Sequence, residues 1–215
     1  MKKLFILAIL LFPLFNASGQ GIGEMAPEKD PINFPPRTLG IDIMFGEGGF
    51  GLGGFYRHLV AGDLTFFTDF SISSEKDQNE FDYIDPYTGE SITYGKKNRV
   101  FLMPLFGGLQ YRMFSSSLGD NLRPYINAAL GPTMVMTTPY DKEFFSAFGK
   151  AQVLYTPGGY IGIGANFGLD TKNVVGINLR YYYIHFFNQG VESLEGRFLT
   201  DLGGFYITIN LGSMY

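Results

Sequence analysis

Apolar and polar residues alternate along most of this chain. The stretch 205–211 shows the pattern most clearly, because every second residue in it is apolar. Successive side chains of a β-strand point to opposite faces, so an alternation of period two predicts a strand with one apolar and one polar face. The apolar positions are Phe205, Ile207, Ile209 and Leu211, and the positions between them are Tyr206, Thr208 and Asn210.

Seven earlier segments show the same alternation, and the connections between segments differ in length. Short turns are expected at 47–49, 58–62, 115–122 and 170–173, and longer loops at 74–98, 138–157 and 188–200. Amphipathic segments joined in this way predict consecutive antiparallel strands. The seven segments are 39–46, 50–57, 63–72, 101–113, 123–134, 160–168 and 175–183.

Such strands could form a soluble sandwich or a membrane barrel. The apolar face continues through all eight segments, whereas a soluble antiparallel sheet keeps one solvated face. The opposite face is rich in glycine and carries charges, which suits the polar interior of a small barrel, and aromatic residues gather near the strand ends. We therefore predict an all-β fold: an eight-stranded antiparallel transmembrane up-and-down β-barrel, closed by pairing of the first and eighth strands.

The start of the chain has the anatomy of an export signal. Two lysines precede an apolar run at 4–15, and small residues at 17–19 offer a cleavage site. The run is shorter than the ~20 apolar residues of a spanning helix, although an uncleaved interfacial anchor is an alternative. The predicted boundaries are a signal peptide at 1–19, a periplasmic proline-rich linker at 20–37 and an outer-membrane barrel at 38–215.

Composition and charge narrow the functional class. The formal net charge of −4 argues against a nucleic-acid partner, which would need a concentrated basic surface. The chain has no cysteine, so neither a disulfide framework nor a lipid-bearing cysteine is expected. Gly162 and Gly164 lack the third glycine of a phosphate-binding loop. We expect no cofactor.

Three short motifs and the chain end carry a resemblance to a known family. The chain stops on Tyr215, in phase with the apolar face, which looks like the assembly signal of outer-membrane barrels. Together with the eight-segment pattern, these features resemble the small eight-stranded outer-membrane barrels of the OmpA/OmpX type, including PorT-like barrels. The motifs are Gly107-Gly108-Leu109-Gln110-Tyr111-Arg112, Gly176-Ile177-Asn178-Leu179-Arg180-Tyr181 and Gly203-Gly204-Phe205-Tyr206-Ile207.

The resemblance implies a place in the Gram-negative cell envelope. It implies an integral protein of the cell outer membrane with both termini in the periplasm, inserted by the barrel-assembly machinery and in contact with outer-membrane lipid and lipopolysaccharide. Members of such families range from anchors to adhesins and lipid-modifying enzymes, so the fold does not determine the function. A structural or accessory role, with an envelope protein as partner, is the leading expectation. The alternative is a channel for small solutes or hydrophobic ligands, with a lateral opening near Pro104 and Pro132.

Seven charged residues fall on the face predicted to line the lumen. An eight-stranded barrel is only wide enough for its side chains to fill it, and a buried charge without a partner is costly. A structural network of Asp42 and Asp69 with Arg180 and its neighbours is therefore expected, and a narrow conductance or proton path is the alternative. The seven residues are Asp42, Arg57, Asp63, Asp69, Arg112, Arg123 and Arg180.

Two further features are candidates for a catalytic site and a metal site. His185 and Asn188 match the His-x-Ser-Asn stretch of outer-membrane lipid A deacylases, but Phe187 stands where the nucleophilic serine would be. His185 is therefore expected in an interfacial aromatic belt, and no catalytic residue is predicted. The loop 74–98 carries six carboxylates, but their spacing matches no calcium-binding loop, so no metal site is predicted.

Overall fold

The structure is a computed structural model, and it describes residues 33–215 with gaps at 78, 85, 88, 90, 117, 119–120, 169 and 189. The expected signal peptide at 1–19 and most of the expected linker therefore lie outside the described residues. The described end of the linker, 33–36, forms no strand, and the first strand begins at Arg37.

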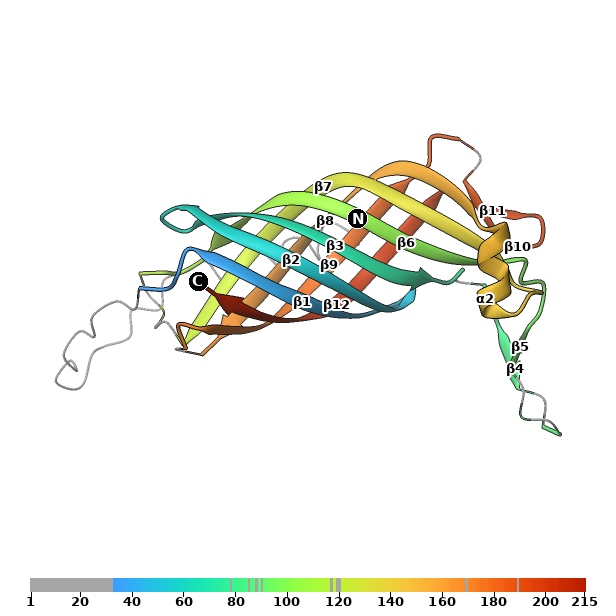
Figure 1. Ribbon diagram of the computed structural model, residues 1–215, viewed down its shortest axis with the longest axis horizontal. Coiled ribbons are helices and arrows are strands. Elements are labelled where there is room, and N and C mark those ends of the chain that lie inside the picture. The colour runs from blue at the N-terminus through green and yellow to red at the C-terminus, as the bar shows by residue number, and fades with distance from the viewer. Residues whose placement is uncertain are drawn as a thin grey trace, which may run out of the picture. The chain divides into compact units, whose positions relative to one another are not determined.

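Eight antiparallel strands form a closed barrel (Figure 1). Each strand pairs with its sequence neighbour in the barrel, and β1 pairs with β12 to close it, with Ile41 opposite Leu211 and Asp42 opposite Asn210. The predicted fold class and the predicted closure are both confirmed. The strands are β1 (Arg37–Gly46), β2 (Gly49–Ala61), β3 (Leu64–Glu75), β6 (Asn98–Arg112), β7 (Leu122–Pro139), β8 (Gln152–Phe167), β9 (Asn173–His185) and β12 (Asp201–Met214).

Both described chain ends and three of the four short connections lie at one end of the barrel, which we call the terminal end; the fourth, the β1–β2 turn at 47–48, lies at the opposite end. The opposite end, the loop end, carries the longer connections (Figure 1). Two of these connections contain small hairpins, β4 (Asp82–Ile84) with β5 (Ser91–Thr93) and β10 (Val191–Leu194) with β11 (Arg197–Leu199). The third contains helix α2 (Phe144–Ala147) and the 3₁₀ helix η2 (Phe148–Lys150).

The strands extend further toward the loop end than the alternation predicted. β8 begins at Gln152 rather than near residue 160, because 152–157 pair in register with 132–137 of β7. Pro157 and Gly158 lie within this added part and obscure the alternation, but Pro157 lies opposite Pro132 and needs no donor there. The ladder of β6 is interrupted near Pro104, yet the barrel stays closed.

The outward face of the barrel is apolar on every strand. Ile161 is 66% exposed, and side chains of the same kind surround it on neighbouring strands. Exposed apolar groups over a whole wall are abnormal for a soluble protein and typical of a lipid-facing surface. Among the described residues, no helix has the length and apolar character needed to cross a membrane. Representative outward residues are Leu39, Ile41, Leu52, Phe70, Leu105, Leu109, Ile126, Ile163, Ile177, Leu179 and Ile207.

Small residues on the inward face allow large side chains to cross the lumen. At Gly40, beside the closing seam, a Cβ atom would overlap the carbonyl oxygen of Leu211 and the ring of Phe55. A residue with a side chain would therefore displace either the β12 backbone or the buried phenylalanine. The glycines of the inward face therefore leave room for the large lumen side chains described below.

Candidate functional site

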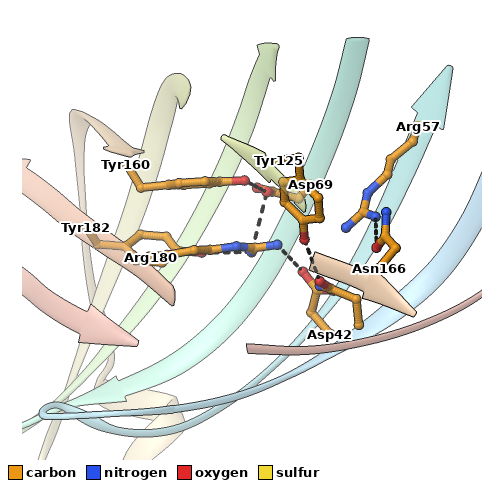
Figure 2. Close-up of polar contacts among 9 residues, drawn as sticks. Asp42, Arg57, Asp69, Tyr125, Tyr160, Asn166, Arg180 and Tyr182 are labelled. Carbon is orange, nitrogen blue, oxygen red and sulfur yellow. Dashed lines mark hydrogen bonds and ion pairs between the residues drawn. The ribbon is translucent and has the colours of Figure 1, made fainter. Parts of the chain in front are cut away.

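A buried ion cluster lies at the middle of the lumen (Figure 2). The Nη2 atom of Arg180, on β9, lies 2.9 Å from Oδ2 of Asp42 on β1, and its Nη1 atom lies 3.7 Å from Oδ2 of Asp69 on β3. All three side chains are less than 5% exposed. The barrel wall brings together two carboxylates and one guanidinium that are far apart in sequence.

Polar side chains surround this ion cluster. The hydroxyl of Tyr160 donates to Asp69 at 2.6 Å, the amide of Asn210 donates to Asp42, and Arg180 donates to the hydroxyl oxygen of Tyr182 at 3.2 Å. These hydrogen bonds satisfy many of the polar groups that a low-dielectric interior would otherwise penalise. Buried polar atoms without a hydrogen-bond partner in the described protein include those of Asn127, Thr133, Asn178 and Thr208. Ordered water is the usual partner of such atoms.

An aromatic layer next to the ion cluster blocks the lumen. The ring centroids of Tyr160 and Tyr182 lie 4.9 Å apart, those of Tyr182 and Tyr206 lie 5.3 Å apart, and Phe106 lies 6.0 Å from Tyr160. Rings at these separations are in van der Waals contact. Phe67 completes the layer, stacked 6.1 Å from Tyr160, and Met44 packs against it.

The loop end contains a second, wholly apolar obstruction, which we call the loop-end plug. Its members are buried and come from β6, β7, β9, β10, β12 and the segment after β9. Because hairpin β10–β11 contributes to it, the connection 186–200 folds over the mouth of the barrel rather than away from it. The plug consists of Val100, Leu102, Val135, Ile184, Phe186, Val191 and Leu202.

Ion pairs join the two loops above the plug. Lys97 bonds Glu192 at 2.5 Å, and Arg197 bonds Asp77 at 2.9 Å. A further pair, Lys96 with Glu80 at 2.6 Å, lies within the connection from β3 to β6. The hydrogen bond from Lys97 lowers the pKa of the exposed Glu192 carboxyl below its ordinary value. Two of the six loop carboxylates considered as calcium ligands, Asp77 and Glu80, are thus paired with cations of this chain. Among the described residues, no group of three or more His, Cys, Asp or Glu side chains could hold a metal ion.

The remaining predicted lumen charges lie nearer the terminal end. Arg57 is inward and donates to Asn166 at 3.4 Å, and Arg123 donates to the carbonyl oxygen of Gly168 at 3.5 Å. Arg112 is half-buried at the end of β6. The prediction that Asp63 belongs to a strand wall is wrong, because Asp63 lies in the turn between β2 and β3, where its carboxylate accepts from the hydroxyl of Ser115 at 2.7 Å.

Sequence analysis missed two carboxylates of interest. Glu75 was assigned to a loop, but it continues the inward face of β3, and its carboxylate accepts from the Tyr206 hydroxyl at 3.2 Å and from the Gly203 N–H at 3.4 Å. The inward serines at 71 and 73 are the pattern that could have revealed it. Asp201 bonds Nδ1 of His185 at 2.8 Å, on the half-exposed outer rim.

His185 lies among aromatic rings, with Tyr183 stacked 6.2 Å away and Phe187 edge-on at 5.0 Å. A serine-type hydrolase needs a hydroxyl within hydrogen-bond distance of the free nitrogen of such a histidine. In the part of the chain that the structure describes, the hydroxyls of Tyr183 and Thr200 both donate to Asp201, and none bonds the ring of His185. Among the described residues, no hydroxyl is therefore placed to act as the nucleophile of His185.

Comparisons with known proteins agree on the fold. No family model matches the sequence, and no curated protein does. Neisserial surface protein A matches with a TM-score of 0.50 and 10% identity, over 83% of this chain and 94% of that one. The N-terminal β-barrel domain of Pseudomonas aeruginosa OprF gives 0.48 and 14%, over 82% and 95%. OprG of the same organism gives 0.46 and 11%, over 85% and 97%.

These identities are low, so the likeness concerns the fold and not the activity. The TM-score of 0.50 and the matched closed barrel confirm the predicted resemblance. The protein therefore has the fold of the small eight-stranded outer-membrane β-barrels.

Proposed function

We propose that this protein is an integral outer-membrane barrel that does not conduct and that serves a structural or accessory role through its loop-end surface. The observation that carries the proposal is the obstruction of the lumen at two levels, by the aromatic layer and by the loop-end plug. Because side chains fill the lumen at two levels, we propose that the barrel acts through its outer and loop surfaces and not as a pore.

The outward face supports a place in the membrane. Its exposed apolar residues form a continuous wall, and the closed sheet leaves no backbone edge to be satisfied by lipid. The proposed surroundings are outer-membrane lipid and lipopolysaccharide, after insertion by the barrel-assembly machinery. Apart from the short β1–β2 turn, the longer connections lie at the loop end and the short ones at the terminal end, and this layout of outer-membrane barrels favours periplasmic termini.

The loop end offers a surface for an envelope protein partner. Hairpin β4–β5 projects from this end (Figure 1), and five large apolar side chains on or beside it are exposed. Tyr87 at its tip is 96% exposed. Exposed aromatic residues amid charges are enriched where proteins bind each other. The five residues are Phe81, Tyr83, Ile84, Tyr87 and Tyr94.

Planar-bilayer recordings of the purified full chain test the proposal. We expect no stable single-channel conductance, because the rings at 106, 160 and 182 block the lumen. Replacing Phe106, Tyr160 and Tyr182 together with alanine and deleting 188–200 should create measurable channel events. A large, stable conductance from the unmodified protein would refute the closed-lumen proposal.

The absence of cysteine makes the orientation directly measurable. With Tyr87→Cys, a membrane-impermeant maleimide added to intact cells should label the protein, because the tip of hairpin β4–β5 would face outward. Ser115→Cys, at the terminal end, should be labelled only after the outer membrane is permeabilised. The reverse pattern would place the termini outside and contradict the proposed layout.

Neither alternative function has comparable support. A lipid-modifying enzyme would need a nucleophile beside His185, where Phe187 lies edge-on to the ring. A hydrophobic-ligand channel would need a lateral opening, but β7 and β8 stay paired through Pro132 and Pro157. The proposed role is accordingly not enzymatic.

A further inference from the structure

The terminal end of the lumen opens into a pocket of about 230 Å³, which we call the terminal vestibule. Phe34, from the segment before β1, lies across it, with the guanidinium of Arg123 only 3.8 Å above its ring. Three guanidinium groups and one carboxylate line the vestibule. The polar side chains that line it are Arg57, Asp63, Gln110, Arg112, Arg123 and Asn166.

Arg57 is a charged group almost withdrawn from water. The residue is 6% exposed, and its direct contacts are with neutral groups: Oδ1 of Asn166 at 3.4 Å and the rings of Phe55 and Tyr125 at 4.2 and 5.7 Å. The Asp69 carboxylate acts on it only at longer range. Figure 2 shows Arg57 and Asn166 beside the ion cluster of Asp42 and Asp69, but no ion pair joins Arg57 to a carboxylate of the described residues. Because Asp69 already pairs with Arg180, Arg57 is a buried cation without a counter-ion in direct contact, which is costly.

Asp63 does not supply the missing counter-ion, because it lies in the turn and accepts from Ser115. A second observation points to the same pocket. Gln110 is 7% exposed, and its side-chain oxygen has no hydrogen-bond partner in the described part of the protein. A carboxamide can be turned to present its two N–H donors instead of its oxygen. A cation and an amide whose oxygen has no partner thus line one pocket.

We propose that the terminal vestibule binds a small oxyanion, a phosphate or a carboxylate, between the guanidinium of Arg57 and the amide of Gln110. The planar fork of a guanidinium matches both groups. Arg112 and Arg123 add positive potential at the entrance. The two oxyanions have different sources: phosphate comes from solution, whereas Glu24, Glu28 and Asp30 precede the vestibule segment in this chain and are a source of carboxylate.

The test uses the full chain in detergent micelles, with inorganic phosphate titrated into an oxyanion-free buffer and heat release measured. Two proteins are compared, the unmodified chain and a variant with Glu24→Gln, Glu28→Gln and Asp30→Asn. Binding to both identifies an external oxyanion as the occupant. Binding to the variant alone identifies the linker carboxylates as the occupant. No binding to either protein up to about 10 mM phosphate would overturn the proposal.

In whichever protein binds phosphate, Arg57→Gln should weaken binding at least ~10-fold, which is about 1.4 kcal/mol. Arg37→Gln is the matched control, since Arg37 is exposed at the same end of the barrel, and it should change the affinity less than about twofold. Equal losses in the two variants would show general attraction to positive charge and overturn the site.

Asn166→Asp keeps the test decisive if Arg57→Gln does not fold. This change keeps the shape of the side chain and places a carboxylate where Oδ1 already accepts from Arg57. It should abolish phosphate binding and raise the unfolding temperature in oxyanion-free buffer, because the counter-ion is then built in. Phosphate affinity unchanged by Asn166→Asp would overturn the proposal.

Discussion

Replacing Arg180 with methionine is expected to lower the free energy of unfolding by about 3–5 kcal/mol. The change removes the cation that bonds Asp42 and faces Asp69, and it leaves both carboxylates buried in the lumen. Methionine is the apolar residue that best approaches the length of the arginine side chain. The loss of stability therefore reflects the removed charge more than the change in side-chain volume. Urea unfolding in lipid vesicles, followed by circular dichroism because the chain has no tryptophan, measures it.

Two further variants separate charge from general damage. Arg37→Met makes the same replacement at an exposed position and should change stability by less than about 0.5 kcal/mol. The triple variant Asp42→Asn, Asp69→Asn, Arg180→Met removes all three charges and should recover most of the loss, since neutral replacement of a whole buried cluster is often tolerated. An Arg180→Met barrel as stable as the unmodified one would show that the cluster is not a structural network.

Placing an arginine at Ile161 is expected to cost about 2–4 kcal/mol, although this side chain is already exposed. Ile161 points outward from the middle of β8, opposite Ala128 on β7 and Tyr181 on β9. If that wall faces lipid, the guanidinium must enter hydrocarbon or displace it. The same unfolding measurement in vesicles of about 30 Å hydrocarbon thickness detects the loss.

The matched control is Tyr87→Arg, at the tip of hairpin β4–β5 beyond the barrel wall. Water surrounds that position in the proposed arrangement, so stability should stay within about 0.5 kcal/mol. A soluble barrel would tolerate arginine at both positions. Equal stability of the Ile161→Arg and Tyr87→Arg variants would therefore contradict insertion in a membrane.

Much of the barrel could be predicted from local sequence, because strand periodicity depends on residues two apart. The alternation placed Asp42, Asp69 and Arg180 on the inward face, and the structure shows each of them buried there. Prediction was poorer at strand ends. Asp63 was placed in a strand although the chain turns there, and β8 was shortened because Pro157 and Gly158 disturb the pattern.

The contacts within the lumen could not be predicted in the same way. Arg180 and Asp42 are 138 residues apart, and their distance depends on strand order, register and barrel closure together. The fold-over of hairpin β10–β11, which completes the loop-end plug, depends likewise on long-range pairs such as Lys97 with Glu192. Glu75 and Asp201 were missed because both lie where strands pass into loops and local alternation fades.

The sequence by itself determined that this protein has eight amphipathic strands, an apolar outer wall and a polar, glycine-rich inner wall, because these properties follow from side-chain chemistry and a two-residue period. Only the tertiary structure decided which inward residues meet, that rings and an apolar plug fill the lumen, and that Arg57 faces the terminal vestibule without an ion-pair partner among the described residues. Those features depend on the register between neighbouring strands. The register is set when the whole sheet closes into a barrel, so it cannot be read from any single strand.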